Sequence, residues 1–98
     1  MMSHLPVNLK KVEQSELEKE ILRAGIIAEL DAVSLYEQLA SITANRHIKR
    51  VLLDIAKEEK THVGEFQALL LALDKQQKTE LAKGSQEVKD LIRIKAMK

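Results

Sequence analysis

Apolar residues recur every three or four positions along two long stretches of the chain, which is the spacing of one face of an α-helix. The first stretch begins where Ser15 and Glu18 match a capping box, and it continues without a helix breaker to residue 44. The second stretch follows the polar segment 43–47, which is the best candidate for a turn. The pattern therefore predicts one helix over 15–44 and a second over 46–73. A connection this short makes neighbouring helices antiparallel.

The rest of the chain has a weaker pattern. Residues 74–86 are polar and are expected to form a connection with a helical turn in it, while Ser85 is a candidate cap for a short last helix over 85–96. Residues 1–12 are expected to be loose. No stretch alternates with period two, and Asn-Gly and Asp-Gly pairs are absent, so strands are not expected. The sequence thus predicts an all-α chain, with residues 1–98 as a single domain.

The first predicted helix carries two apolar stripes rather than one. The first stripe consists of Leu22, Ile26, Val33, Tyr36 and Ala40, and the second of Leu17, Ile21, Ala24, Ala28, Leu35, Leu39 and Ile42. A helix that is apolar on two sides is covered on two sides, and a hairpin partner covers only one of them. We therefore expect other copies of the chain to cover the stripe that the hairpin partner leaves free, most simply in a four-helix bundle completed by dimerisation.

Composition limits the class of function. The chain has 16 basic and 15 acidic residues, for a formal net charge of +1, and no basic block is interleaved with aromatic residues, so no nucleic-acid partner is expected. Cysteine is absent, which excludes disulfides and thiolate metal sites and agrees with a reducing cytosol. No apolar run is long enough to span a bilayer, and no apolar signal core is found near the N-terminus. We expect a cytoplasmic protein with no membrane partner.

Three polar residues interrupt the apolar faces of the two long helices. Glu29 lies on the first stripe, and Glu59 and His62 form a Glu-x-x-His pair on the second helix. Glu29 is 16 residues from a turn at residue 45, and Glu59 and His62 are 14 and 17 residues from it, so all three lie at one level, about 24 Å from the turn. Burying these groups without a nearby Lys or Arg is unfavourable unless a metal binds them. Oxygen and imidazole ligands without thiolate suit iron or manganese. Gly64, beside His62, is expected to allow a close helix approach.

One Glu on one helix and Glu-x-x-His on the next is half of the ligand set of ferritin-like di-iron sites, where two helices supply a Glu each and two supply Glu-x-x-His. Two copies related by a two-fold axis would supply four carboxylates and two imidazoles for two metals, one iron per chain and two per dimer. The packing of the first helix and the ligand count therefore predict a dimer independently.

The segments EILRAGIIAELDAVSLYEQLA and VLLDIAKEEKTHVGEFQALLLAL, within residues 20–73, resemble the encapsulated ferritin-like proteins carried inside encapsulin nanocompartments. The resemblance implies that Glu29, Glu59 and His62 bind the metals and that Tyr36 lies near them. It implies that Asp31 lines the route by which iron reaches the site. We then expect Glu59 of both chains to bridge the metals, and Tyr36 to hydrogen-bond a ligand or donate an electron.

The resemblance also implies an activity and partners. Members of the family form two-helix subunits, commonly assembled into a ring of five dimers, and act as ferroxidases that oxidise Fe(II) to Fe(III) with O₂. The iron is then mineralised inside the encapsulin shell. The C-terminal stretch VKDLIRIKAMK does not read as the short apolar, Gly- and Ser-containing targeting peptide of free-standing cargo. A divergent tail, a fusion to the shell protein and another mode of loading are the alternatives.

Two further functions compete with the ferroxidase reading. The chain could be a structural helical oligomerisation module, in which Glu29, Glu59 and His62 hydrogen-bond one another across a dimer. It could instead be a rubrerythrin-like di-iron protein that reduces peroxide, although such proteins usually have four-helix subunits and often a cysteine-bound iron. A flavin site is disfavoured because the chain has one Tyr and one Phe and no Trp.

Overall fold

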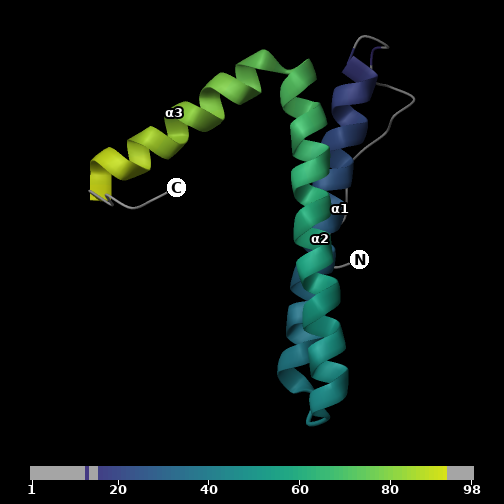
Figure 1. The fold of residues 1–98 in the computed structure, drawn as a ribbon. Helices are drawn as coiled ribbons and strands as arrows, with labels where there is room; N and C mark the ends of the chain where they lie inside the picture. Colours follow the sequence, from purple (N-terminus) through teal and green to yellow (C-terminus); the bar gives the residue numbers. More distant parts are fainter. Residues whose placement is uncertain (1–12, 14–15, 93–98) are drawn as a thin grey trace.

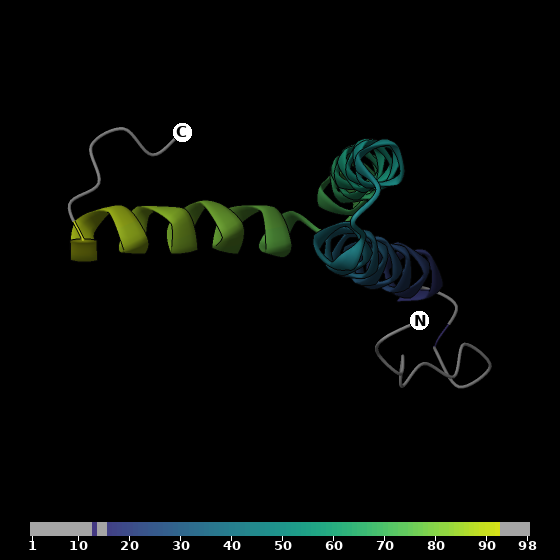
Figure 2. The same ribbon diagram turned by 90° about the horizontal axis from the view of Figure 1, so that it is seen from below.

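The computed structural model describes residue 13 and residues 16–92 of the chain. This part contains the helices α1 (Leu17–Ile42), α2 (Arg46–Leu73) and α3 (Lys75–Ile92), and no strand. Helices α1 and α2 lie side by side as an antiparallel hairpin, and α3 leaves the open end of the hairpin at an angle (Figure 1). The view along the hairpin shows α3 pointing away from both other helices (Figure 2). The predicted all-α fold is confirmed.

The hairpin turns at residues 43–45 because Asn45 caps the second helix. Its side-chain Oδ1 accepts hydrogen bonds from the backbone N–H groups of His47, at 2.9 Å, and Ile48, at 3.0 Å. These bonds satisfy two of the donors that a helix leaves free at its N-terminus. The Oγ1 atom of Thr43 in turn accepts a hydrogen bond from the N–H of Asn45 at 3.2 Å. The turn is therefore held by its own polar side chains.

The start of α1 differs from the predicted one. The helix begins at Leu17, and its N-cap is Glu16, whose side chain makes no capping hydrogen bond. The predicted capping box with Ser15 as the cap is therefore wrong, and Ser15 itself lies outside the described residues. Glu18 and Glu20 lie in the first turn, where the positive end of the helix dipole favours carboxylates.

The third helix corrects a second prediction. It begins at Lys75, ten residues before the expected start at Ser85, so the expected connection over 74–86 is helical. Asp74 provides the reason, because its Oδ1 accepts a hydrogen bond from the N–H of Gln77 at 3.0 Å and its carbonyl accepts one from Lys78 at 3.2 Å. An Asp followed three residues later by Gln is a helix start. Residues 93–96 of the predicted last helix, and residues 1–12, lie outside the described part of the chain.

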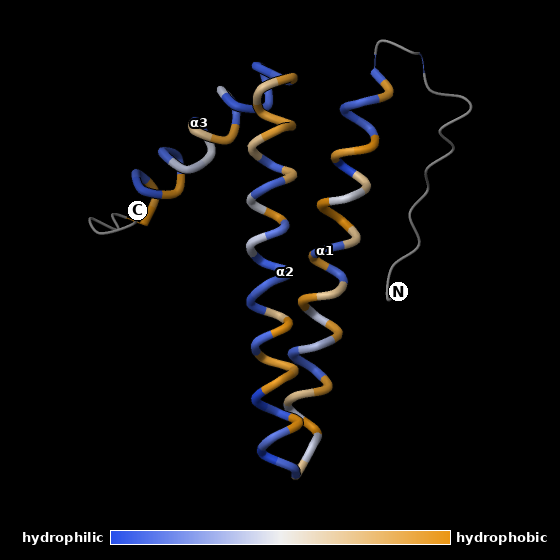
Figure 3. The backbone as a smooth tube through the Cα atoms, turned by 45° about the vertical axis from the view of Figure 1, so that its right-hand side comes forward, coloured by the Kyte–Doolittle hydropathy of each residue, from blue (hydrophilic) through white to orange (hydrophobic). Residues whose placement is uncertain are grey.

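The described chain has a thin core along the seam between α1 and α2. Its buried residues are Leu22, Val33, Ala40, Ala56 and Leu70. The three from α1 belong to the first predicted stripe, whereas the second stripe leaves large side chains exposed, up to Ile42 at 79%. Figure 3 shows apolar positions recurring along the whole hairpin, and α3 buries none of its residues. One chain therefore covers only one side of α1, as the two stripes predicted. No helix in the described part is long and apolar enough to cross a membrane.

Candidate metal centre

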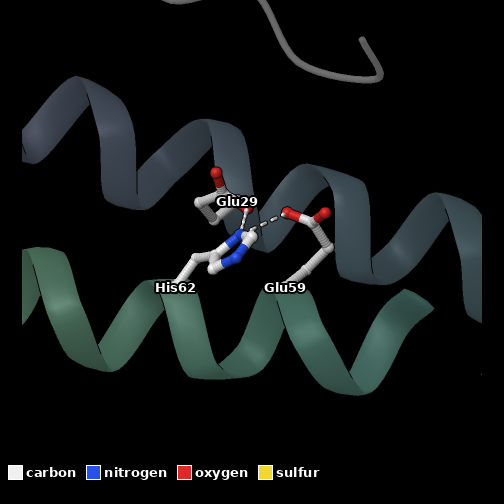
Figure 4. A group of neighbouring side chains, drawn as sticks. All are labelled: Glu29, Glu59 and His62. Carbon is white, nitrogen blue, oxygen red and sulfur yellow. Dashed lines mark ion pairs between the residues drawn. The ribbon is translucent and has the colours of Figure 1, made fainter. Parts of the chain in front are cut away.

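Three side chains with metal-ligating atoms converge halfway along the hairpin. Glu29 reaches from α1, and Glu59 and His62 reach from successive turns of α2 (Figure 4). The Nδ1 atom of His62 lies 3.4 Å from Oε2 of Glu29 and 3.4 Å from Oε2 of Glu59. One ligand atom of each residue lies within 4.8 Å of the others. The antiparallel hairpin thus brings together the three residues that the sequence places at one level.

The cluster is half-buried, and one of its oxygens has no hydrogen-bond donor. The side chains of Glu29, Glu59 and His62 are 22%, 19% and 44% exposed. Oε2 of Glu29 is buried without a hydrogen bond, although Nδ1 of His62 lies 3.4 Å from it. No Lys or Arg of the described chain pairs with either carboxylate. A buried acceptor without a donor is destabilising, and a bound cation would remove that penalty.

The chemistry of these donors selects the kind of cation. Two carboxylate oxygens and one imidazole nitrogen, without sulfur, are the donor set that suits iron or manganese. Three donors fall short of the roughly four to six ligands that divalent metals hold in proteins. The exposed side of His62 leaves the cluster open to a neighbouring molecule. The described residues therefore form a group that could hold a metal ion, with coordination positions left for ligands from outside the chain.

A close helix approach lies next to the cluster, at Gly25 rather than at Gly64. Gly25 precedes Glu29 by one turn, and Phe66 follows His62 by one turn. A Cβ atom at Gly25 would lie 3.3 Å from Cδ2 and Cε2 of the Phe66 ring, whereas one at Gly64 would have nothing within 4 Å. The ring thus fills the space left by the missing side chain. The expected role of Gly64 is wrong within the chain, because this residue is on an exposed side of α2.

The other predicted site residues lie on α1 outside the cluster. Tyr36 is half-buried two turns beyond Glu29, about 10 Å along the helix axis. Its hydroxyl has no hydrogen bond to a described residue. Asp31 is half-buried two residues after Glu29, which places it on the opposite side of α1. The structure therefore groups Glu29, Glu59 and His62 and separates them from Tyr36 and Asp31.

Comparison with known proteins agrees with this arrangement. The sequence profile of the rubrerythrin family matches residues 20–96. Over 90 residues the chain is 53% identical to a ferritin-like–encapsulin shell fusion protein of Pyrococcus furiosus, a match that covers 92% of the chain and 26% of that protein. Over 68 residues it is 37% identical to the encapsulin nanocompartment cargo protein EncC of Myxococcus xanthus, covering 69% of the chain and 52% of that protein. The chain thus spans about a quarter and about half of these two relatives.

A solved structure gives the same result for the fold. The chain has a TM-score of 0.83 and 51% sequence identity to the crystal structure of the encapsulated ferritin domain from Pyrococcus furiosus, with 98% of this chain and 100% of that chain covered. The three-helix arrangement, the family profile and these relatives agree with one another. The chain therefore belongs to the rubrerythrin family of ferritin-like proteins and, within it, to the encapsulated ferritin-like proteins.

Proposed function

We propose that the chain is a ferroxidase that oxidises Fe(II) to Fe(III) with O₂ at a di-iron site shared between two subunits. The observation that carries the proposal is the cluster of Glu29, Glu59 and His62, in which Oε2 of Glu29 is buried without a hydrogen-bond donor. A carboxylate oxygen that is buried without a donor favours the binding of a cation. The carboxylate and imidazole donors match iron, the metal of ferritin-like di-iron sites.

A second subunit is needed because one chain supplies half of the ligands. Two copies would place four carboxylates and two imidazoles around two irons, one iron per chain. Glu59 of each copy would bridge the two irons, and Glu29 and His62 would each bind one of them. His62 ligates as a neutral imidazole, so iron binding should weaken in acid. The exposed second stripe of α1 supplies apolar surface for the same pairing.

Two neighbouring irons allow a two-electron reaction. Each Fe(II) gives up one electron, so O₂ gains two electrons and, with two protons, becomes hydrogen peroxide. Tyr36 lies about 10 Å from Glu29 along α1, and its hydroxyl is free of hydrogen bonds to described residues. It could therefore hydrogen-bond a ligand of the partner-completed site or donate an electron to it. Asp31, on the opposite side of α1, is assigned to the route by which iron arrives.

The partners follow from the family. The relatives are named as an encapsulin shell fusion protein and an encapsulin nanocompartment cargo protein. By this likeness the chain acts in the cytoplasm inside an encapsulin nanocompartment, where the oxidised iron is mineralised and stored. Its homo-oligomer would be a ring of five dimers. The iron is in this view the substrate of the protein as well as the occupant of the site.

Anaerobic Fe(II) titration of the purified protein tests the proposal. We expect one tightly bound iron per chain, lost in Glu59→Ala and in His62→Ala, and rapid oxidation when air is admitted. Glu65→Ala is the matched control, because Glu65 is an exposed carboxylate on the same helix and should leave the stoichiometry unchanged. A wild-type protein that binds no tight iron would contradict the proposal, and the three residues would then be polar contacts of a structural helix bundle.

Peroxide reduction is the second candidate, and the match to the rubrerythrin profile favours it. The two reactions differ in which oxidant the reduced site prefers. Protein loaded anaerobically with Fe(II) is mixed with O₂ or with H₂O₂, and the appearance of Fe(III) is followed by absorbance. Faster oxidation by O₂ supports the ferroxidase, whereas much faster oxidation by H₂O₂ would make peroxide the oxidant.

A further inference from the structure

The direction of α3 depends on one residue between two helices. Helix α2 ends at Leu73 and α3 begins at Lys75, so Asp74 alone interrupts the helical backbone, with φ −118° and ψ 89°. From this corner α3 runs away from the hairpin (Figures 1 and 2). Because a corner of one residue can bend by changing very few torsion angles, the contacts that hold Asp74 also set the angle at which α3 leaves.

The packing of α3 contributes little to that angle. None of its residues is buried, and only its first two turns border the hairpin. There Gln77 and Leu81 line a groove together with Arg23, Ile26, Ile27, Gln67 and Leu70. Farther along, Val88, Leu91 and Ile92 are 40%, 84% and 53% exposed. A segment with so few buried apolar contacts is not held in place by a core.

Asp74 uses all four of its polar groups to join the three helices. Its N–H donates a hydrogen bond to the carbonyl of Leu70 at 2.8 Å, at the end of α2. Its Oδ1 atom and its carbonyl accept hydrogen bonds from the N–H groups of Gln77, at 3.0 Å, and Lys78, at 3.2 Å, at the start of α3. Its Oδ2 atom accepts a hydrogen bond from Nη2 of Arg23 on α1, also at 3.0 Å. We call Arg23 and Asp74 the corner pair.

The corner pair is built more firmly than an ordinary surface ion pair. The Asp74 side chain is only 13% exposed, so water screens its charge less than in an exposed pair, and the bond from Arg23 is charge-assisted. The other end of the guanidinium is fixed as well, because Nη1 of Arg23 donates to Oε1 of Glu20 at 2.9 Å. Arg23 is thus held on α1 in the orientation that meets the corner.

We propose that the corner pair fixes the direction of α3, and that the helix swings about Asp74 when the pair is broken. The backbone hydrogen bonds of Asp74 lie within the ends of α2 and α3, whereas the bond from Arg23 ties the corner to α1. Glu87 lies 13 residues beyond Asp74, which is about 20 Å along α3, so a rotation of roughly 30° moves it by about 10 Å. The pair thereby keeps the exposed apolar end of α3 away from the exposed apolar side chains of its own hairpin. No metal ligand takes part, so this proposal is independent of the proposed function.

A distance measurement within one chain tests the proposal. Spin labels are placed on Ser34→Cys in α1 and Glu87→Cys in α3, which are exposed positions in a chain without other cysteines. Labelled metal-free protein is diluted with an excess of the same unlabelled variant, so that pulsed electron paramagnetic resonance reports distances within single chains. The distribution of distances is then compared between the wild type and variants of the corner pair.

Two variants break the corner pair in different ways. Asp74→Asn keeps an oxygen for the N–H of Gln77 but places an amide N–H₂ group toward Arg23. Arg23→Gln leaves Asp74 and the start of α3 untouched. Lys19→Gln is the matched control, because it removes the same charge one turn earlier on α1, where Lys19 pairs with Glu16.

We expect one narrow distribution in the wild type and the control. In each corner variant the distribution should broaden and its centre should shift by several ångströms, with the helical content by circular dichroism unchanged. Arg23→Gln/Asp74→Asn should resemble the single variants, because all three lack the same bond. A wild-type distribution in Arg23→Gln overturns the proposal, and so does equal broadening in Lys19→Gln. A loss of helical content in Arg23→Gln also overturns it, because the pair would then keep α3 folded rather than set its direction.

Discussion

Gly25 offers a direct test of how the hairpin holds its cluster. Its absent side chain leaves room for the Phe66 ring, one turn from Glu29 on α1 and one turn from His62 on α2. In Gly25→Ala the new Cβ would lie 3.3 Å from two ring atoms and 3.4 Å from a third. Either the ring or the helix spacing must then shift by a few tenths of an ångström. The cluster lies directly beside this contact, so a shift of the helix spacing also moves Glu29 relative to His62.

Two opposing terms set the size of the effect. Replacing Gly by Ala inside a helix stabilises the folded state by about 1 kcal/mol, whereas an extra methyl group in a packed contact destabilises it by about 1–3 kcal/mol. We therefore expect Gly25→Ala to lie between no change and a loss of about 2 kcal/mol. Gly84→Ala on α3 is the matched control. A Cβ there has nothing within 4 Å, so this variant should show the gain of about 1 kcal/mol alone.

The assay is urea unfolding of the metal-free protein, followed by circular dichroism at one fixed protein concentration because oligomerisation shifts apparent stability. The free energies of Gly25→Ala and Gly84→Ala should differ by about 1–3 kcal/mol in favour of Gly84→Ala. Adding Phe66→Leu to Gly25→Ala removes the ring atoms that meet the new methyl group. The double variant should then be less destabilised than the sum of the two single changes, by about 0.5–3 kcal/mol.

Iron binding shows whether the contact between Gly25 and Phe66 positions the cluster or only packs the two helices together. If the contact fixes the spacing of the ligands, Gly25→Ala should bind Fe(II) more weakly than the wild type, and the double variant should recover part of that affinity. Two results would refute the reasoning. One is a Gly25→Ala protein as stable as Gly84→Ala, and the other is a pair of single changes whose effects simply add.

Two further predictions concern the helix ends. Asn45→Ala removes the acceptor for the N–H groups of His47 and Ile48 and should lower the free energy of unfolding by about 1 kcal/mol, with the iron stoichiometry unchanged; an equally stable variant would contradict the capping role. The pKa of Asp74 is held below its usual 3.8, first by the hydrogen bond from the Gln77 N–H and then by the nearby Lys19 and Arg23 charges. A carboxyl whose folded pKa is lowered contributes stability above its unfolded pKa and loses it as the pH falls through the folded one. Wild-type protein should therefore lose stability below about pH 4 more steeply than Asp74→Asn, and parallel pH profiles in urea unfolding would count against this.

The long helices and the convergence of Glu29, Glu59 and His62 could be predicted because both depend on residue spacing along straight helices. Once the turn near Asn45 is fixed, helix geometry alone sets the level of Glu29 against Glu59 and His62. The two apolar stripes of α1 were likewise predicted, and the structure shows that the first of them forms the seam, with Leu22 and Val33 buried there. Sequence periodicity carries this information directly, since each helix residue adds the same rise and rotation.

The features that were missed depend on single atoms rather than on periodicity. The start of α3 is fixed by one side-chain oxygen of Asp74, in a segment whose polar composition suggested a loop. The Asp74 side chain also accepts a hydrogen bond from Arg23 of α1 at 3.0 Å, a contact between residues 51 positions apart that no local pattern contains. The D-x-x-Q spacing was the available signal for the helix start. Gly25 and Phe66 gave none, because each is unremarkable until the other is placed against it.

Assembly and metal binding should be thermodynamically linked in this protein, because one step relieves two separate deficits of the single chain. The hairpin buries few residues and leaves Ile42 79% exposed, so its core is thin for a chain of this size. The Glu29 Oε2 atom is buried without a hydrogen-bond donor, which is the second deficit. A second copy that covers the apolar stripe would also bring the ligands that hold a cation beside this oxygen. A ligand that binds only the assembled state stabilises that state by mass action. Iron should therefore tighten the dimer, and the dimer should tighten iron by the same factor.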